Sequence, residues 1–203
     1  MLEQLEKIDR AIIVQVNSWN TPFLDELMWL VSWIPTWIPL YLLLIFLVYK
    51  KENRNVMLLY ILCFALLIGI TDQVSSSFFK PFFARYRPSH NLDILKEYSA
   101  LHFYEKSPGD FYKGGKYGFV SGHSANSFAI AVFASLVLKT HVKKIAVFLI
   151  LWATLVAYSR MYLGVHYLSD CIAGAIVGSV IAYLVYTFVY KRFYKQYKAE
   201  QTI

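Results

Sequence analysis

Charged residues are scarce in this sequence. Asp, Glu, Lys and Arg make up 16% of its 203 residues, whereas hydrophobic residues make up 58%. A soluble domain usually carries about a quarter charged residues. The shortage therefore excludes an ordinary soluble domain and indicates a protein that is integral to a membrane.

Cysteine is almost absent as well. Cys63 and Cys171 both fall inside apolar runs, with no CxxC motif and no Cys/His spacing. This excludes a disulfide scaffold and a zinc-finger type of site, so we expect both thiols to be packing residues. The start of the chain, MLEQLEKIDR, has mixed charge and lacks the basic region of a signal peptide. We therefore expect no cleaved signal peptide, and the apolar segments themselves should direct the chain to the membrane.

Acidic residues are fewer than basic ones, 13 against 20, which gives a net charge of +7. Such an excess can indicate nucleic-acid binding. Here, however, the cations are gathered in short clusters between apolar runs. Orientation in a bilayer explains this pattern more simply, so we expect no nucleic-acid partner. The sequence predicts nothing about the oligomeric state.

Five segments are apolar and long enough to cross the hydrocarbon core, which takes about 20 helical residues. They are residues 27–49, 56–79, 118–138, 142–159 and 167–190. Pro35 and Pro39 should kink the first crossing or confine its regular part to the C-terminal half. A sixth crossing over residues 11–33 is the alternative, although Asn17 and Asp25 interrupt it.

The segment before the first crossing has the pattern of an amphipathic helix. Its apolar residues recur mostly every three or four positions from Leu2 to Trp19, with charged residues between them. We therefore expect residues 1–22 to form a helix that lies in the membrane interface. The predicted fold is all-α: one polytopic membrane bundle over residues 1–203, with a transmembrane core over residues 27–190.

Basic residues predict how the bundle is oriented. They dominate three stretches that share one side of the membrane, KKENR at 50–54, KTHVKK at 139–144 and KRFYKQYK at 191–198. Lys and Arg favour cytoplasmic connections, so the tail at 191–203 should be cytoplasmic and the loop at 80–117 external. We expect the chain in the cytoplasmic (inner) membrane of a bacterium, with its functional site facing the periplasm or exterior.

Cations gather at the predicted external ends of the crossings. Lys80 and Arg87 follow the second crossing, and Arg160 precedes the last one. Cations at such positions are often simple boundary anchors. The stretch KPFFARYRPSH, however, has no acid near its cations in sequence, which suggests that their partner is an external anion.

Two histidines open apolar helices at the same end. His166 and Asp170 are four residues apart, so on a helix the carboxylate can fix one ring nitrogen and leave the other as a nucleophile. A structural His/Asp pair would have the same spacing. Ser121 is suited to cap a helix, Gly122 lets a ligand approach the backbone, and free N–H groups there favour an anion. His123 can donate a proton to a leaving oxygen.

Together these groups suit phosphoryl transfer. Cations and backbone donors hold the phosphate oxygens, one histidine attacks phosphorus, and the other protonates the leaving group. No carboxylate cluster suited to Mg²⁺ and no His/Cys cluster suited to Zn²⁺ accompanies them in the sequence. The sequence therefore predicts a metal-independent reaction with no cofactor.

Three motifs resemble, in order and spacing, the signature of the type-2 phosphatidic acid phosphatase superfamily. They are Lys80-x6-Arg87-Pro88, Ser121-Gly122-His123 and Arg160-x5-His166-x3-Asp170. The family usually has proline before Ser-Gly-His, where this chain has Val120, a change that concerns loop rigidity more than reactivity. Arg85 lies outside the pattern, and we expect a rim cation that either contacts a headgroup or anchors the boundary.

The resemblance implies a role for each matched residue. His166 would attack phosphorus, with Asp170 orienting it, and His123 would protonate the leaving group and later activate water. The other matched residues would bind the phosphate oxygens; they are Lys80, Arg87, Ser121, Gly122 and Arg160.

The implied activity is that of a membrane lipid phosphatase with a phosphohistidine intermediate and a phosphorylated lipid as substrate. Undecaprenyl pyrophosphate suits a small bacterial enzyme with an external site; phosphatidylglycerophosphate, phosphatidate and lipid A are the alternatives. A transporter or flippase of anionic lipids would also gather cations at a membrane rim, although it should carry repeats or broken helices at the midplane. Release of inorganic phosphate would separate an enzyme from a transporter.

Two further features have more than one interpretation. Asp72, within the second crossing, would either take part in a relay or pair with a polar group on a neighbouring helix. Residues 89–117 interleave aromatic residues with charges and should lie over the external pocket. They would either select headgroups or form an interfacial loop.

Overall fold

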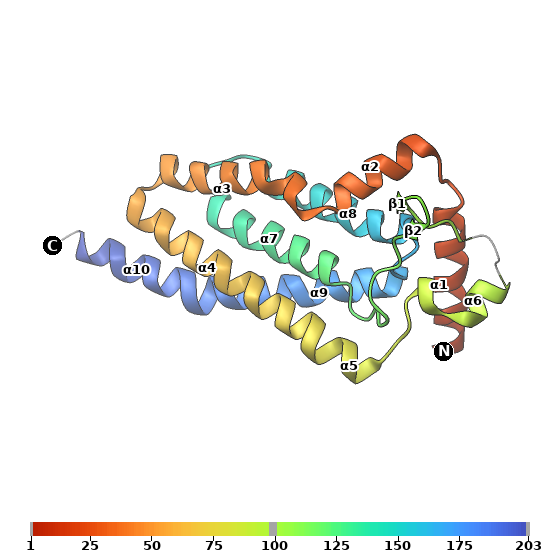
Figure 1. Ribbon diagram of the computed structural model, residues 1–203. Coiled ribbons are helices and arrows are strands. Elements are labelled where there is room, and N and C mark those ends of the chain that lie inside the picture. The colour runs from red at the N-terminus through yellow and green to blue at the C-terminus, as the bar shows by residue number, and fades with distance from the viewer. Residues whose placement is uncertain (1, 98–100, 202–203) are drawn as a thin grey trace.

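The computed structural model describes residues 2–97 and 101–201. Figure 1 shows long helices running side by side, with α1 lying across one end of the bundle and the C-terminus at the other. The main helices are α1 (Leu2–Asn17), α2 (Pro22–Ser32), α3 (Ile38–Lys51), α4 (Arg54–Asp72), α7 (Gly122–Leu138), α8 (Ile145–Tyr162), α9 (Leu168–Leu184) and α10 (Lys191–Glu200).

Short elements connect these helices. They are 3-10 turns at Ile34–Trp37 and Pro88–His90, π-helical turns at Gln73–Phe79 and Val185–Tyr190, α5 (Lys80–Phe83), α6 (Leu92–Glu97), β1 (Glu105–Ser107) and β2 (Asp110–Phe111). The two strands pair antiparallel within residues 80–117, which we call the external loop after the side predicted for it. The predicted all-α class therefore describes the bundle correctly but misses this small ribbon. Residues 98–100 of the predicted external loop lie outside the described residues.

Four helices in the described part of the chain are long and apolar enough to cross a membrane. They are Ile34–Lys51, Arg54–Phe83, Ile145–Tyr162 and Leu168–Glu200. α7 is apolar but has 17 residues. That length corresponds to about 26 Å at 1.5 Å per residue, slightly less than the ~30 Å hydrocarbon core. The structure thus has four of the five predicted crossings by length, and α7 as the fifth remains a prediction.

The first predicted crossing, residues 27–49, is not one helix. α2 ends at Ser32 and α3 begins only at Ile38, with a 3-10 turn between them. Proline lacks the N–H group that a helix interior needs, so Pro35 and Pro39 interrupt the apolar run. The prolines therefore break the segment, as predicted, but residues 27–32 remain regular helix in α2, and the longer helix, α3, lies in the C-terminal half.

Residues 11–33 do not form a sixth continuous crossing either. α1 ends at Asn17 and α2 starts at Pro22, where Thr21 Oγ1 accepts a hydrogen bond of 3.2 Å from the Leu24 N–H. Proline in the first turn and a threonine cap are a strong helix start. The polar interruption of this segment is therefore a real break between two helices.

α1 is helical, but it is more than a surface helix. Ile13 and Val16 are buried in a hydrophobic cluster with residues of α8. The Asn17 side chain donates hydrogen bonds of 2.8 Å to the carbonyls of Tyr162 and His102. α1 is thereby fixed to the end of the bundle, while its place in a membrane interface remains a prediction.

Two other predicted boundaries shift. The third apolar segment starts as a helix at Gly122 rather than at residue 118, because Ser121 caps it. The predicted tail at 191–203 is helical as far as Glu200, since α9 continues through a π-helical turn into α10.

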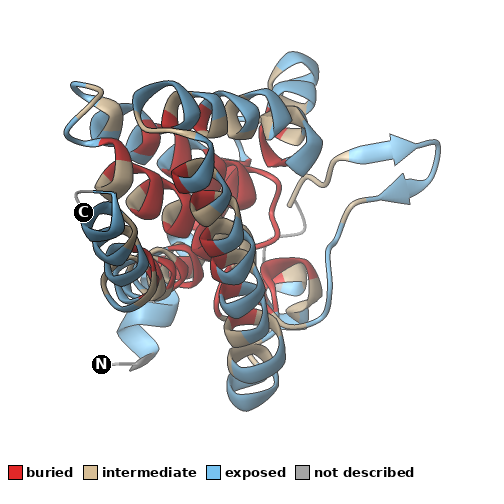
Figure 2. Ribbon diagram, turned by 90° about the vertical axis from the view of Figure 1, so that its left-hand side faces the viewer, coloured by how far each residue is buried: buried red, intermediate tan, exposed pale blue. Residues whose placement is uncertain are grey.

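Buried residues face the centre of the bundle and exposed residues face outward (Figure 2). The outward faces are nevertheless apolar. Exposed side chains there include Leu42, Phe46, Leu62, Leu66, Leu151, Ile176, Val180 and Phe188. An apolar exterior of this extent suits contact with lipid rather than water. Cys63 and Cys171 are buried free thiols, as predicted.

α7 packs closely against α9 because two glycines leave room for its backbone. A Cβ atom at Gly174 would lie 2.6 Å from the Ser121 carbonyl oxygen, and one at Gly178 would collide with the Ala125 carbonyl group. Small residues allow membrane helices to approach at backbone distance. This contact sets the distance between His123, on α7, and the residues at the start of α9.

Gly178→Ala should lower the thermal unfolding midpoint of the detergent-solubilised protein, because the added methyl group meets backbone that has no free rotation. Overpacking of this kind costs about 1–3 kcal/mol. Gly69→Ala is the matched control, since a Cβ atom there meets nothing within 4 Å. Alanine is also the better helix former, so the control should unfold at the same temperature or slightly higher. Equal midpoints for the two variants would contradict the packing argument.

Candidate active site

A cavity of about 240 Å³ lies where the external loop meets the ends of α7 and α8. Six of the eight predicted site residues line it: Lys80, Arg87, Gly122, His123, Arg160 and His166. The other two, Ser121 and Asp170, are fully buried. The fold thus gathers residues from three separate motifs around one hollow.

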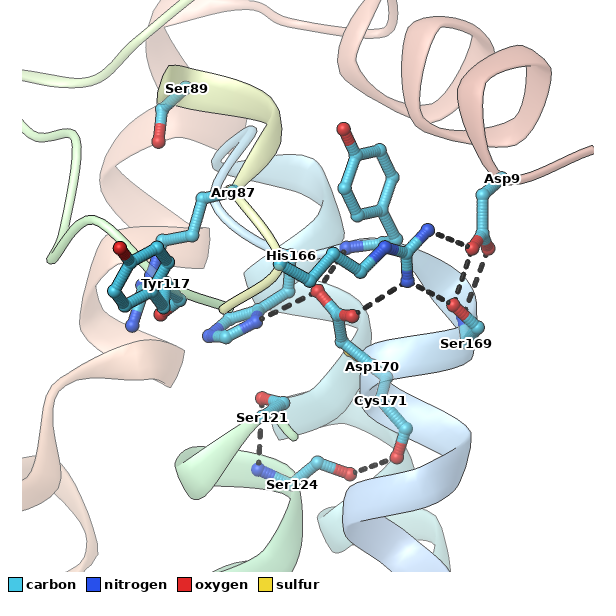
Figure 3. Close-up of polar contacts among 12 residues, drawn as sticks. Asp9, Arg87, Ser89, Tyr117, Ser121, Ser124, His166, Ser169, Asp170 and Cys171 are labelled. Carbon is cyan, nitrogen blue, oxygen red and sulfur yellow. Dashed lines mark hydrogen bonds and ion pairs between the residues drawn. The ribbon is translucent and has the colours of Figure 1, made fainter. Parts of the chain in front are cut away.

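His166 lies between α8 and α9 and is 1% exposed. Its Nδ1 atom is 3.4 Å from Asp170 Oδ2, the pairing that the four-residue spacing predicted (Figure 3). With Nδ1 engaged on this side, Nε2 is the ring nitrogen that remains for the cavity. The side chain is therefore held in one orientation.

The pKa of His166 lies well below the ordinary histidine range. Burial is the main cause, and the positive charges of Arg87, Arg160 and Lys80 lower it further. The imidazole is consequently neutral at pH 7 and carries the lone pair that a nucleophile needs.

Asp170 makes contacts beyond the histidine. Its Oδ2 atom also accepts a hydrogen bond of 3.1 Å from the Tyr167 N–H, which caps the start of α9. Its backbone carbonyl accepts a hydrogen bond of 3.0 Å from the Ser121 N–H. The residue that orients His166 is therefore tied both to its own helix and to the start of α7.

The start of α7 is prepared for an anion. Ser121 Oγ accepts a hydrogen bond from the Ser124 N–H at 3.4 Å, and Ser124 Oγ donates one of 2.6 Å to the Cys171 carbonyl. A Cβ atom at Gly122 would lie 3.8 Å from Lys80 Nζ. The lysine ammonium group is thus close to a helix N-terminus, where backbone N–H groups favour negative charge.

Lys80 and Arg87 are positioned by their own segments. Lys80 Nζ donates a hydrogen bond of 3.2 Å to Ser76 Oγ, one turn earlier in the same helix. Arg87 Nε donates one of 3.1 Å to the Tyr117 carbonyl, and the Arg87 N–H donates one of 3.1 Å to the Lys116 carbonyl. The returning end of the external loop therefore fixes Arg87 at the cavity.

Arg160 is 1% exposed and links three segments. Nη1 donates a hydrogen bond to Ser32 Oγ in α2, and Nη2 donates one of 2.6 Å to Tyr112 Oη next to β2. Nε is buried with no hydrogen-bond partner among the described residues. Ser32 had no motif to mark it, because only the folded chain brings α2 to α8.

The external loop closes over part of the cavity. Tyr112, Gly114 and Gly115 line it, so this part of residues 89–117 lies at the cavity as predicted, whereas β1 and β2 are exposed and project away from the bundle (Figure 2). Asp72 lines it as well, and Ser76 Oγ lies 3.5 Å from Asp72 Oδ1 in the same helix. Asp72 therefore belongs to the wall of the cavity.

Arg85 is not the rim cation that the sequence predicted. Nη1 donates a hydrogen bond of 2.9 Å to Asp170 Oδ1, and Nη2 donates one of 2.7 Å to Asp9 Oδ2 in α1. Arg85 is absent from the cavity wall. The sequence could not predict these two ion pairs, because Asp9 and Asp170 lie 76 and 85 residues away from Arg85 along the chain.

Among the described residues, no group of three or more His, Cys, Asp or Glu side chains could hold a metal ion. Apart from tyrosines, the charged and titratable side chains in the described wall of the cavity are one lysine, two arginines and two histidines, against the single carboxylate of Asp72. A cavity of this composition suits an anionic ligand.

Comparison with known proteins identifies the family. Residues 58–194 match the model of the PAP2 superfamily, which covers more than half of the chain. The chain belongs to the PAP2 superfamily. This agrees with the resemblance carried by the three motifs.

Two curated relatives of this PAP2 protein are lipid A 4'-phosphatases. That of Porphyromonas gingivalis is 34% identical over 173 residues, covering 85% of this chain and 69% of the relative. That of Bacteroides thetaiotaomicron is 32% identical over 176 residues, covering 87% of this chain and 74% of the relative. With the family match, they show that the chain is a membrane lipid phosphatase.

Two crystal structures share the fold. A transmembrane PAP2-type phosphatidylglycerolphosphate phosphatase from Bacillus subtilis aligns with a TM-score of 0.67 at 22% identity, over 93% of this chain and 87% of that one. LpxE of Aquifex aeolicus aligns with a TM-score of 0.58 at 23% identity, over 86% of this chain and 92% of that one.

Gly118→Ala should lower turnover by about 100-fold, the cost of displacing reacting groups by about 1 Å. The added Cβ atom would lie 2.8 Å from Asp170 Oδ2, 3.1 Å from Arg87 Cγ and 3.5 Å from His166 Nδ1. Phosphate release should fall more than the unfolding midpoint does, with Gly69→Ala as control. Full turnover in the Gly118 variant would show that the space beside Asp170 is not needed.

Proposed function

We propose that this membrane phosphatase removes phosphate from a lipid headgroup through a covalent phosphohistidine at His166. The observation that supports this most is the shared cavity: a neutral His166 backed by Asp170, a second histidine, His123, and three cations. Each group alone has an ordinary structural explanation. Their convergence on one hollow matches what phosphoryl transfer requires.

The reaction would proceed in two steps. His166 Nε2 attacks phosphorus, the bond from phosphorus to the leaving oxygen breaks, and His123 gives that oxygen a proton. A water molecule then attacks the phosphohistidine while His123 takes its proton, which releases inorganic phosphate and restores the neutral imidazole. Asp170 orients His166 and stabilises the positive charge that forms on its ring.

The cations would bind the non-bridging oxygens of the phosphate. Lys80, Arg87 and Arg160 surround the cavity from three segments, and the N–H groups at the start of α7, next to Ser121 and Gly122, complete the cradle. Fixed positive groups stabilise the charge of the transferring phosphoryl group without reorganisation. We infer that no metal ion is required for this step.

The cavity should face the external side of the membrane. The basic stretches at 50–54 and 191–198 belong to the end of the bundle away from α1, near the C-terminus in Figure 1. Cationic connections favour the cytoplasm, so the opposite end would face the periplasm or exterior.

We infer that the preferred substrate is a phosphorylated glycolipid of the lipid A type. Both curated relatives are lipid A 4'-phosphatases. An apolar hollow of about 210 Å³ adjoins the cavity and shares His123 with it, lined by Trp29, Trp33, Ile34 and Pro35. This hollow suits the lipid portion next to a phosphate. Undecaprenyl pyrophosphate, the substrate first expected from the sequence, is the second candidate.

His166→Asn should reduce phosphate release by at least about 1,000-fold, because the nucleophile is lost. Purified protein would be assayed in EDTA with lipid A, undecaprenyl pyrophosphate, phosphatidylglycerophosphate and phosphatidate, and lipid A should give the highest kcat/KM. His141→Asn is the matched control. His141 Nε2 lies 3.0 Å from Glu52 Oε1, and His141 is not among the residues that line the cavity.

Each result of this panel tests a separate statement. Turnover by His166→Asn equal to the wild type would refute the nucleophile. A strict need for added divalent cation would refute the metal-independent route. A higher kcat/KM for undecaprenyl pyrophosphate than for lipid A would make undecaprenyl pyrophosphate the preferred substrate. Lipid uptake without phosphate release would favour a transporter.

His123→Asn should separate the two chemical steps. With a pyrophosphate substrate the leaving phosphate needs little protonation, so the variant should still phosphorylate His166. Hydrolysis of the phosphohistidine would then be slow, because no base activates water. Rapid quenching should therefore trap more acid-labile phosphoprotein in His123→Asn than in the wild type. Trapping on a residue other than His166 would contradict the assignment.

A further inference from the structure

The side chain that holds Asp170 from behind is Arg85. The two Asp170 oxygens have different partners. Oδ2 lies 3.4 Å from His166 Nδ1 and accepts a hydrogen bond of 3.1 Å from the Tyr167 N–H, and Oδ1 accepts the hydrogen bond of 2.9 Å from Arg85. An Arg–carboxylate bond has a fixed direction, so Arg85, together with the Tyr167 N–H, sets the rotation of the carboxylate and the position of Oδ2 beside the histidine.

Arg85 is in turn held by α1. Asp9 Oδ2 accepts the hydrogen bond of 2.7 Å from Arg85 Nη2. Figure 3 shows Asp9 next to Ser169, the residue before Asp170. The side chain of Asp9 is 2% exposed, that of Asp170 is 0% exposed, and that of Arg85 is 23% exposed. We call Asp9, Arg85 and Asp170 the anchoring triad.

Neighbouring groups fix the triad in place. The Ser169 N–H donates a hydrogen bond of 3.0 Å to Asp9 Oδ1, and Ser169 Oγ also donates to Asp9. The guanidinium group of Arg85 lies over the Tyr167 ring, 4.2 Å from its centroid. Both Arg85 and Asp9 are thus attached to the first turn of α9, beside the residue that they hold.

The triad does not touch the substrate cavity. Neither Asp9 nor Arg85 is among the residues that line it, whereas Arg87, two positions further along, is. The family match begins at residue 58, so α1 and Asp9 lie outside it. A role for Asp9 would therefore be a property of this chain's N-terminal helix.

The charges in the triad favour a carboxylate next to His166. Burial lowers the pKa of Arg85, but the carboxylates of Asp170 and Asp9 outweigh burial, and the pKa is raised. The guanidinium group stays charged, and two carboxylates with one guanidinium leave a net charge of −1. That charge favours the positive imidazole ring formed when His166 attacks phosphorus.

We propose that Asp9 and Arg85 are positioning residues for catalysis, which hold the Asp170 carboxylate in register with His166 and so make α1 part of the catalytic apparatus. The proposal rests on the proposed nucleophilic role of His166. Groups that orient a functional histidine from one step further away commonly contribute about 10- to 100-fold to activity. The effect should fall on kcat, because neither side chain contacts the phosphate.

The test uses the full-length protein in detergent and four variants: Asp9→Asn, Arg85→Lys, Arg85→Gln and Asp9→Asn with Arg85→Gln. Phosphate release from lipid A gives kcat and KM. The inhibition constant of inorganic phosphate, a competitive inhibitor, measures how tightly the cavity binds phosphate. The amount of phosphoprotein in the first turnover counts the active sites, so that kcat refers to folded molecules only.

Asp9→Asn should lower kcat per active site by about 10-fold or more, with KM and the phosphate inhibition constant within about threefold of the wild type. Arg85→Gln should lower it further. Arg85→Lys keeps the charge but not the fork of donors, so it should recover part of the loss. The double variant should be no worse than Arg85→Gln alone, because residues that act as a unit are not additive.

Glu6→Gln is the matched control for Asp9→Asn. It makes the same change in the same helix, at a side chain that is 51% exposed and lies 3.9 Å from Arg10. Its kcat, KM and active-site count should equal those of the wild type. A similar loss in this control would assign the effect to α1 in general and overturn the proposal.

Other outcomes also decide the matter. If Asp9→Asn and Arg85→Gln yield fewer active sites but unchanged kcat per site, the triad only stabilises the fold and the proposal is wrong. A rise in KM with unchanged kcat would assign Arg85 to substrate binding instead. Failure of the underlying function is recognised separately, since the wild type itself would then form no phosphohistidine.

Discussion

The carboxylate of Asp170 is the point on which the geometry of the site depends. It caps the start of α9 through the Tyr167 N–H, faces His166 Nδ1 and accepts a hydrogen bond from Arg85, while its backbone carbonyl accepts one from Ser121. A fully buried carboxylate is costly unless its lone pairs are satisfied. The partners of the carboxylate and of the backbone carbonyl belong to three different segments. The hydrogen bonds of Asp170 therefore place α7, α9 and the external loop relative to one another.

The site also depends on a contrast between paired and unpaired cations. Arg85 is held between two buried carboxylates, whereas Lys80 and Arg87 line the cavity beside His123. Cations that converge repel one another, and a bound anion relieves that repulsion. Burial, together with these charges, keeps His166 neutral in the free protein. The same arrangement therefore favours both a bound anion and a neutral His166.

Packing explains how a bundle with an apolar exterior keeps this polar end together. Gly174 and Gly178 bring α9 to backbone distance from α7, so little space is left for lipid between the helices that carry the site. At the same end, α1 and the external loop supply polar partners to α8. Asn17 donates a hydrogen bond to the Tyr162 carbonyl, and Tyr112 Oη accepts one from Arg160. The end of the bundle that holds the cavity is thus assembled from membrane helices and from segments outside them.

The residues that meet at the cavity could be predicted from sequence because they occur as residue types at short spacing. His166 and Asp170 share a helical turn, Ser121 precedes a helix, and prolines 35 and 39 break one. The apolar runs likewise predicted the bundle, since only segments of that length and composition satisfy a bilayer. Local periodicity and local capping were sufficient for these features.

Only the tertiary structure decided which charges line the cavity and which hold the protein together. Arg85 and Arg87 have the same side chain and are two residues apart, yet one is paired to α1 and α9 and the other lines the cavity. Asp9 is 160 residues from Ser169, to which it is hydrogen-bonded, and no local pattern relates them. The sequence by itself determined the apolar helices and most of the predicted residues that line the cavity. The partners of each buried charge depend on contacts between distant segments, which exist only once the chain has folded.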